Sequence, residues 1–159
     1  MEQQWKRLTG EEIHRPIAEE IESVICKEKQ QGHLLKACIG TDSQVKGTVT
    51  AVATVIVLVR KGKGGFMYIR HEANRQKMSI KQRMLLEVSR SIEVAYDLYR
   101  LFALYEVEME VHADINTNPE FRSSDALSEA MGYIMSMGFA FKAKPQAFAS
   151  SSCANKAVR

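Results

Sequence analysis

The sequence contains few cysteines, prolines and glycines. These residues form disulfide frameworks and zinc sites, or mark the linkers that divide a chain. Its three cysteines, Cys26, Cys38 and Cys153, form no Cys-x-x-Cys pair and no metal-binding spacing with histidine. There are only three prolines and nine glycines in 159 residues, and no repeat, low-complexity tract or linker divides the chain. These features exclude a disulfide-stapled or zinc-finger class and predict a single domain over 1–159 with reduced thiols.

Long hydrophobic runs are also missing. The longest largely apolar run, Thr48–Val59, has 12 residues, whereas a helix that crosses a bilayer needs about 20. The first seven residues lack the apolar segment of a secretion signal. Because the thiols are also expected to be reduced, the sequence predicts a cytoplasmic protein that does not enter a membrane.

The charge is small in sum but unevenly distributed. The whole chain has a net charge of +3, whereas the segment from Arg60 to Arg83 carries +7 and the remainder −4. The basic residues of this segment are Arg60, Lys61, Lys63, Arg70, Arg75, Lys77, Lys81 and Arg83. Such an excess favours contact with a phosphate backbone, because each neutralised phosphate releases counterions. It is equally typical of a solvated hairpin whose charges prevent aggregation, so both interpretations stay open here.

The spacing of apolar residues predicts the order of helices and strands. The predicted helices cover about 16–31, 79–105, 124–137 and a terminal segment that begins near 150–153. The predicted strands cover 34–42, 47–59, 66–71, 106–114 and 139–144. A three-strand meander followed by alternating helices and strands predicts the α/β class, with a mixed sheet flanked by helices. An N-terminal helical extension over 1–32 precedes this sheet.

Three acidic residues occupy positions suited to chemistry. Asp42 ends the first predicted strand, Asp114 ends the fourth, and Glu87 lies in the first half of the long helix. At 100° per residue, Glu87 lies about 90° from the centre of the apolar stripe of that helix, and Glu93 about 150°. Glu87 can therefore lean toward the sheet, whereas Glu93 faces solvent.

If the first and fourth strands are parallel neighbours, Asp42 and Asp114 meet at the edge where α/β sheets bind ligands. Carboxylates held close together repel one another unless a cation lies between them. Oxygen ligands without a histidine or cysteine cluster favour Mg²⁺ or Mn²⁺. Such ions activate a water molecule and stabilise the leaving oxygen of a phosphodiester, so the acidic and basic residues point to the same substrate.

Each of these residues also has a plainer interpretation. A single aspartate at a strand end is often a turn or cap residue. An exposed Glu87 would pair with Arg83 or Arg90 on its own helix. Three further polar residues beside the predicted site, Ser43, His112 and Asn116, are auxiliary candidates. His112 could move a proton, although a histidine half-buried on a sheet face is the commoner case.

Three segments together resemble the ribonuclease-H-like superfamily. They are Ile39-Gly40-Thr41-Asp42-Ser43, Arg83-Met84-Leu85-Leu86-Glu87 and His112-Ala113-Asp114-Ile115-Asn116. Within the superfamily, the sequence is most similar to the bacterial YkuK-type family, and the resemblance covers nearly the whole chain from about Gly32. It implies a five-stranded mixed sheet of order 3-2-1-4-5 flanked by helices, and metal-dependent cleavage of nucleic acid by carboxylates.

Carried over to this chain, the resemblance assigns metal ligation and catalysis to Asp42, Glu87 and Asp114. The superfamily commonly has a fourth acidic ligand on its terminal helix, and here Asn155 stands at that position. An amide oxygen can coordinate Mg²⁺ but brings no charge, so a second metal ion should bind more weakly.

The leading hypothesis is therefore a Mg²⁺- or Mn²⁺-dependent nuclease that hydrolyses RNA, DNA or a hybrid. The alternative is a module of the same fold that binds nucleic acid or a protein without cleaving it, which Asn155 favours. A third hypothesis is hydrolysis of a small phosphorylated metabolite.

Overall fold

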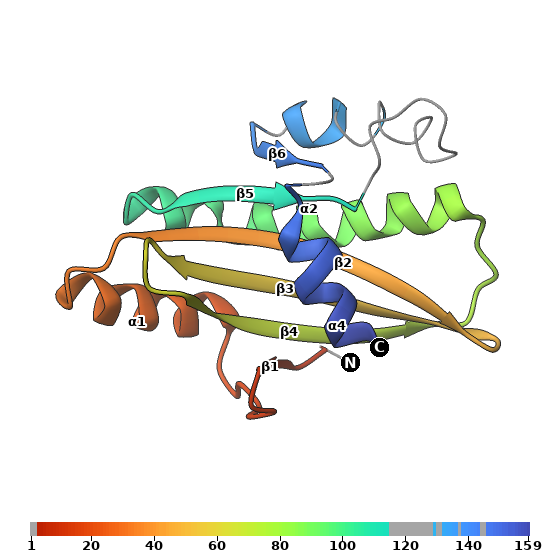
Figure 1. Ribbon diagram of the computed structural model, residues 1–159, viewed down its shortest axis with the longest axis horizontal. Helices are drawn as coiled ribbons and strands as arrows, with labels where there is room; N and C mark the ends of the chain where they lie inside the picture. The colour runs from red at the N-terminus through yellow and green to blue at the C-terminus, as the bar shows by residue number, and fades with distance from the viewer. Residues whose placement is uncertain (1–2, 115–128, 130–131, 137, 144–145) are drawn as a thin grey trace.

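Six strands form one mixed sheet in the order β1-β4-β3-β2-β5-β6. The computed structural model describes residues 3–114, 129, 132–136, 138–143 and 146–159 (Figure 1). The strands are β1 (Trp5–Arg7), β2 (Leu35–Lys46), β3 (Val49–Arg60), β4 (Gly65–Asn74), β5 (Glu108–His112) and β6 (Ala140–Lys142). The helices are α1 (Ile17–Gln30), α2 (Ile80–Leu104), the π-helical turn η1 (Ala149–Ala154) and α4 (Asn155–Val158).

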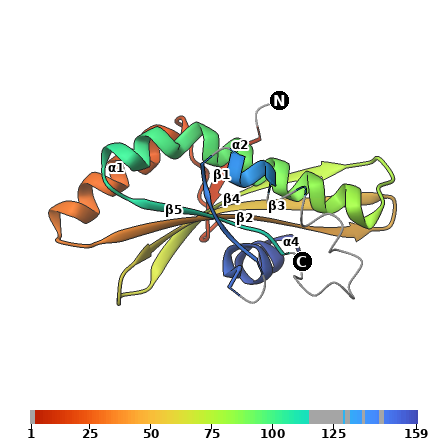
Figure 2. The ribbon, with the colours of Figure 1, turned by 90° about the horizontal axis from the view of Figure 1, so that it is seen from above.

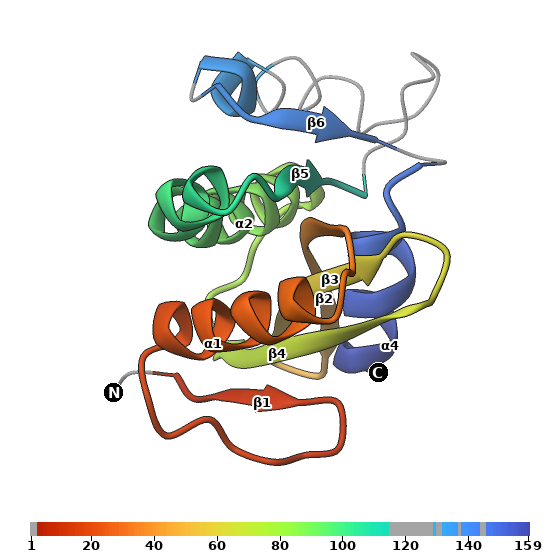
Figure 3. The same ribbon diagram turned by 90° about the vertical axis from the view of Figure 1, so that its left-hand side faces the viewer.

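The pairing of the strands confirms the predicted mixed α/β sheet. β2, β3 and β4 form an antiparallel meander, and β2 pairs with β5 and β5 with β6 in parallel. In the numbering of the sequence prediction, this is the expected order 3-2-1-4-5. The prediction was incomplete at one edge, where β1 adds a sixth strand antiparallel to β4. Figure 3 shows the strands following one another from β1 at one edge to β6 at the other.

The sequence predicts a purely helical N-terminal extension. This prediction was wrong for its first residues. Residues 5–7 join the sheet, and Trp5 is buried opposite Arg70, whose guanidinium lies 5.0 Å from the centre of the Trp5 ring. A three-residue strand is too short to show a period in the sequence, because only its pairing partner makes it a strand. The main helix, α1, begins after Pro16 as predicted.

Helices cover both faces of the sheet. α1 and α2 lie on one face, and η1 with α4 lies on the other (Figure 2). Along β2 the side chains alternate between these layers. Thr41 bonds Ser91 of α2 at 2.7 Å, whereas the neighbouring Asp42 bonds Asn155 of α4 at 2.7 Å. The larger core, which includes Ile39, Ile56 and Phe102, lies between the sheet and α1–α2.

α2 is the long helix that the sequence predicted. Ser79 caps its first turn, accepting from the Gln82 backbone N–H at 3.1 Å, and the Gln82 side chain accepts from the Ser79 N–H at 2.8 Å. This reciprocal capping box satisfies two of the amide donors that every helix start exposes. Within the described residues, no helix is long and apolar enough to span a membrane.

The C-terminal segment begins its helix differently from the prediction. Residues 149–154 form a π-helical turn, and α-helical geometry starts at Asn155. The helix predicted over 124–137 lies largely outside the described residues, of which 129 and 132–136 are helical. Asn116 also lies outside the described residues.

Buried ion pairs attach α1 to the sheet, and one of them makes acid stability testable. Both carboxylate oxygens of Glu28 accept from the Arg60 guanidinium, each at 2.7 Å, and Glu28 Oε2 lies 2.6 Å from His33 Nδ1. The hydrogen bonds from Arg60 lower the pKa of Glu28 to about 2, from 4.5. The pair therefore stabilises the fold above about pH 4.5, and this contribution is lost as the pH falls toward 2.

We expect Glu28→Gln to lower the free energy of unfolding at pH 7 by about 2 kcal/mol, because the hydrogen bonds to a charged group are lost. Urea unfolding at pH 7 and pH 3 measures this effect, and the gap from wild type should shrink at pH 3. The matched control is Glu19→Gln on the exposed side of α1, which should change stability by less than about 0.5 kcal/mol. An equal gap at both pH values would contradict the prediction.

Candidate functional site

Asp42 lies within β2, where the sheet faces α4, and not at the end of its strand as predicted, because pairing with β3 continues to Lys46. Its side chain is only 6% exposed, and Oδ2 accepts a hydrogen bond of 2.7 Å from Asn155 Nδ2. Burial raises the pKa of Asp42, and the nearby charge of Asp114 raises it further, while the bond from Asn155 opposes both. The predicted position of Asn155 next to this aspartate is thus what the structure shows.

Glu87 approaches from the opposite face of the sheet. Its side chain on α2 is 9% exposed and accepts a hydrogen bond of 2.5 Å from Ser43 Oγ. Burial raises the pKa of Glu87 to about 8, and the negative charges of Asp42 and Asp114 contribute to the increase.

The alternative in which an exposed Glu87 pairs along its helix is wrong. Arg90 instead binds Glu72 at 2.9 Å and Glu93 at 3.1 Å, and Glu93 faces solvent as predicted. Glu87 is turned to the sheet because it lies beside the apolar stripe of α2, where Met84 and Val88 are buried.

Asp114 follows β5 by two residues. β5 runs parallel to β2 with Gly40 opposite His112, so Asp42 and Asp114 both stand two residues beyond this pair. The predicted parallel neighbourhood of the two strands is therefore confirmed. Asp114 is half-buried, and its charge acts on both Asp42 and Glu87. Asp42 and Asp114 thus continue the register of the two strands side by side, and Glu87 lies near enough for both of their charges to act on it.

The carboxylates nevertheless do not form a tight cage. Among the described side chains, only Cys38, Glu110 and His112 are a group of three whose possible ligand atoms all lie within 4.8 Å of one another. The wider spacing of Asp42, Glu87 and Asp114 follows from their approach from two faces of the sheet. It suits Mg²⁺, which keeps several of its water molecules and is usually bound through one or two carboxylates. Burial raises the pKa values of Asp42 and Glu87, with a smaller contribution from neighbouring negative charge, and a nearby divalent cation would stabilise their ionised forms.

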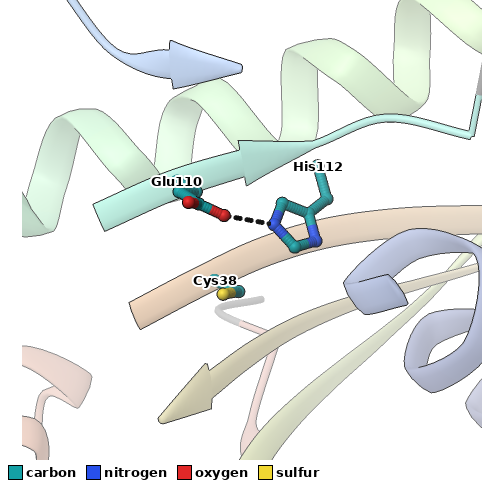
Figure 4. Close-up of side chains that lie close together, drawn as sticks. All are labelled: Cys38, Glu110 and His112. Carbon is teal, nitrogen blue, oxygen red and sulfur yellow. Dashed lines mark hydrogen bonds and ion pairs between the residues drawn. The ribbon is translucent and has the colours of Figure 1, made fainter. Parts of the chain in front are cut away.

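Cys38, Glu110 and His112 form a second cluster, between β2 and β5 on the face that η1 covers (Figure 4). His112 Nε2 lies 2.9 Å from Glu110 Oε2, and Lys36 Nζ lies 2.6 Å from Glu110 Oε1. His112 Nδ1 accepts from the Ala149 backbone N–H at 3.1 Å. A thiol and an imidazole beside a carboxylate could hold a metal ion, and these softer donors favour zinc over magnesium.

The hydrogen bonds of His112 show what the cluster does in the absence of a metal. Because Nδ1 accepts from a backbone amide, Nε2 carries the proton and donates to Glu110. Burial lowers the pKa of His112 and raises that of Cys38 to about 12, so imidazole and thiol are both neutral at pH 7. His112 therefore anchors η1 to β5, which agrees with the structural interpretation of this residue.

Sequence reasoning missed Cys38 and Glu110 as members of this cluster. Cys38 and Glu110 are directly paired in neighbouring parallel strands. This pairing would have been a usable signal once the strand register was known. His112 follows Glu110 by two residues and shares its face. The register of β2 with β5 was needed to bring Cys38 to that pair.

The basic residues divide between the two ends of the sheet. Arg60, Lys61 and Lys63 lie at the β3–β4 hairpin, where Arg60 is paired with Leu35. Asp42 lies seven residues further along β2, which corresponds to roughly 23 Å of strand. Arg75, Lys77, Lys81 and Arg83 lie at the other end, in the loop before α2 or in its first turns.

Two arginines among the predicted nucleic-acid contacts, Arg60 and Arg70, are held against the body of the protein. Arg60 is held by Glu28, and Arg70 is half-buried against Trp5. Lys61 lies 4.0 Å from Glu108 and Lys81 lies 3.2 Å from Glu129, whereas Lys63, Arg75 and Lys77 are exposed. The segment 60–83 is therefore not one continuous basic surface, because the antiparallel return of β4 carries its two halves to opposite ends of the sheet.

The buried Glu87 makes a pH-dependent stability testable. Its pKa of about 8 lies above the ordinary 4.5, so the metal-free folded state retains a proton that the unfolded chain releases. Stability should therefore decrease as the pH rises from about 4.5 and be lowest above about 8.

We expect Glu87→Gln, which resembles the protonated form, to exceed wild type in unfolding free energy at pH 9 by on the order of 2 kcal/mol. At pH 5 the two proteins should be nearly equal. Guanidinium unfolding in EDTA at both pH values measures the difference, with Glu93→Gln as the exposed control on the same helix. If the gap in unfolding free energy between Glu87→Gln and wild type is no larger at pH 9 than at pH 5, this explanation is ruled out.

Comparison with known proteins places the chain in a family. A model of the family described as "Ribonuclease H-like" matches residues 16–159. The chain is 29% identical over 154 residues to "Uncharacterized protein YkuK" of Bacillus subtilis (strain 168), covering 88% of this chain and 87% of that protein. No solved structure matches. The family match extends over the whole described sheet except β1, and the chain therefore belongs to the ribonuclease-H-like family.

Proposed function

We propose that this protein is a nuclease that hydrolyses phosphodiester bonds of nucleic acid with the help of Mg²⁺ or Mn²⁺. Asp42, Glu87 and Asp114 would hold the metal. The observation that carries the proposal is the placement of Glu87, which is buried, bonded to Ser43 and near enough to Asp42 and Asp114 for their charges to act on it. A fold gains no stability from confining three carboxylates in this way, whereas a metal site requires it.

Each residue of the proposed site has a distinct task. When bound, the metal supplies an activated water molecule and neutralises charge on the phosphate. Ser43 fixes the Glu87 carboxylate through its hydroxyl, and Asn155 orients the Asp42 carboxylate through its amide N–H. Because Asn155 faces Asp42 as a donor and brings no negative charge, we propose that a second metal ion binds more weakly than the first.

Phosphate contacts are proposed for the basic residues at the same end of the sheet. Arg75 and Lys77 precede α2, and Lys81 lies in its first turn, on the same helix as Glu87. Lys61 and Lys63 are roughly 23 Å from Asp42 along the strands, so only a substrate about seven base pairs long or longer would reach from them to the proposed site. Arg60 and Arg70 keep structural roles as well, because Glu28 and Trp5 contact them.

A specific observation favours a second candidate, a module that binds nucleic acid or a protein without cleavage. Asn155 occupies the place of an acidic ligand and is satisfied by Asp42. A site that has lost one negative charge could keep its phosphate contacts and lose its catalytic metal.

One set of incubations separates the candidates. The protein is mixed with labelled RNA, DNA and hybrid duplexes in Mn²⁺, in Mg²⁺ and in EDTA, and with p-nitrophenyl phosphate as a small phosphate ester. Cleavage of a polymer that requires the metal supports the nuclease. Salt-sensitive binding without cleavage supports the module, and turnover of the small ester alone supports the metabolite hydrolase.

A further inference from the structure

Arg83 lies beside the carboxylates but is held by a different kind of partner. It precedes Glu87 by one helical turn on α2. Its Nε donates to Ser43 Oγ at 3.2 Å, and Nη2 donates to the Ser43 carbonyl oxygen at 3.2 Å. Since Ser43 follows Asp42 and its hydroxyl bonds Glu87, the guanidinium is fixed next to two of the three carboxylates.

The positive charge of Arg83 acts on the carboxylates, although Arg83 forms no ion pair with a carboxylate of the described residues. The charge lowers the pKa values of Asp42 and Glu87, against the larger effect of burial. Yet no carboxylate oxygen of the described residues lies within 4.0 Å of the Arg83 nitrogens, whereas Arg90, two turns later, binds both Glu72 and Glu93. A guanidinium has five N–H donors, and the bonds to Ser43 use two of them.

Formal charge indicates what the remaining donors are for. With all three carboxylates ionised, as metal binding would require, they and the one guanidinium sum to a charge of −2. One divalent cation cancels that charge. For an anion that then enters, the half-buried guanidinium of Arg83 would be a partner that the chain itself supplies. The planar fork of arginine matches the oxygens of a phosphate, which a lysine ammonium at this position would not do.

We infer that Arg83 binds a non-bridging oxygen of the substrate's phosphate group and so makes the site specific for negatively charged phosphate esters. This inference rests on the proposed function, since it requires the metal-loaded carboxylates. The competing role is purely internal, with Arg83 holding Ser43 so that Ser43 holds Glu87. The two roles make opposite predictions for metal binding. Removing a cation from the site should tighten metal binding, whereas loosening Glu87 should weaken it.

The experiment measures both affinities on the full chain. Mn²⁺ binding is followed by electron paramagnetic resonance without RNA. Binding of a fluorescein-labelled 12-nucleotide RNA is followed by anisotropy in Ca²⁺ buffer, beside the same sequence with uncharged methylphosphonate linkages. The variants are Arg83→Gln, Arg83→Lys and the control Arg100→Gln, which removes one exposed charge near the other end of α2.

We expect Arg83→Gln to weaken RNA binding about tenfold to a hundredfold while Mn²⁺ binding stays equal or becomes tighter. Arg83→Lys should fall between Arg83→Gln and wild type, and Arg100→Gln should match wild type. The preference for charged over uncharged linkages should decrease in Arg83→Gln.

Three results would overturn the inference. They are weaker Mn²⁺ binding with unchanged RNA binding, a parallel loss of both in Arg83→Gln and Arg83→Lys, and RNA binding by Arg83→Gln equal to that of Arg100→Gln. The first two identify the internal role. If wild type itself binds neither Mn²⁺ nor RNA, the proposed function fails, and the inference fails with it.

Discussion

Asp42→Asn is expected to reduce metal-dependent cleavage at least about a thousandfold, because the metal loses the one charged ligand that lies on the central strand. A metal-bound nucleophile and a neutralised leaving oxygen are each worth several kcal/mol at the transition state, and about 1.4 kcal/mol corresponds to a factor of ten in rate. Asparagine keeps the shape of the side chain and can still accept the hydrogen bond that Asn155 donates to Asp42. The rate of cleavage of the best substrate in Mn²⁺ measures this effect.

The same variant should fold at least as well as wild type, which separates lost chemistry from lost structure. Burial raises the pKa of Asp42, which means that the charged form is costly in the folded protein without metal. In EDTA, the melting temperature of Asp42→Asn should therefore equal or exceed that of wild type. Asp97→Asn, on the exposed side of α2, is the control and should cleave normally. An Asp42→Asn protein that cleaves like wild type would exclude the carboxylate site altogether.

Gly40→Ala should cost about 3 kcal/mol of stability, at the upper end of the cost of overpacking. A Cβ at residue 40 would lie 2.5 Å from the Ser150 backbone nitrogen and 2.6 Å from the Ala149 carbonyl carbon. Both atoms belong to η1, whose position is also held by the Ala149 N–H bond to His112. Because the colliding atoms are backbone, η1 must move as a unit, and Asn155 at its end must move with it.

Urea unfolding measures the loss of stability, and hydrogen exchange of the C-terminal segment shows where it arises. The amides of η1 and α4 should exchange faster in Gly40→Ala, while those of α1 should be nearly unchanged. Gly132→Ala is the matched control, since a Cβ there would meet no described atom within 4 Å. Alanine in this helical position should change stability by less than about 1 kcal/mol. Equal stability of the two variants would show that η1 does not pack on Gly40 as described.

Local chemistry explains which parts of the fold were predictable. The reciprocal cap of Ser79 and Gln82 begins α2 where the sequence places it, because a cap involves residues only three apart. A mixed sheet followed from the predicted hairpins and crossover helices, whereas the order of the five strands from β4 to β6 was implied by the resemblance to the ribonuclease-H-like superfamily. β1 escaped prediction because its strand character comes from β4, about 60 residues away.

The candidate site, too, was predictable only in part. The sequence selected Asp42, Glu87 and Asp114 as candidates, and the angle of Glu87 on its helix correctly turned it toward the sheet, although Asp42 lies inside β2 and not at its end. The side of the sheet from which each approaches depends on the packing of α2 and α4, and so does the bond between Asn155 and Asp42. Arg60 and Arg83 are the first and last residues of the basic segment and have separate roles. The Arg60 guanidinium binds Glu28 of α1, whereas the Arg83 guanidinium binds Ser43 of β2.

Element type and the choice of candidate acidic residues follow from periodicity and spacing along the chain, which depend on neighbours a few residues apart. The raised pKa of Glu87, the neutral His112 that holds η1, and the separation of the basic residues depend on groups brought together from distant segments. Burial and charge act through space and not along the chain. Only the folded structure therefore brings Asp42, Glu87 and Asp114 together as one candidate site.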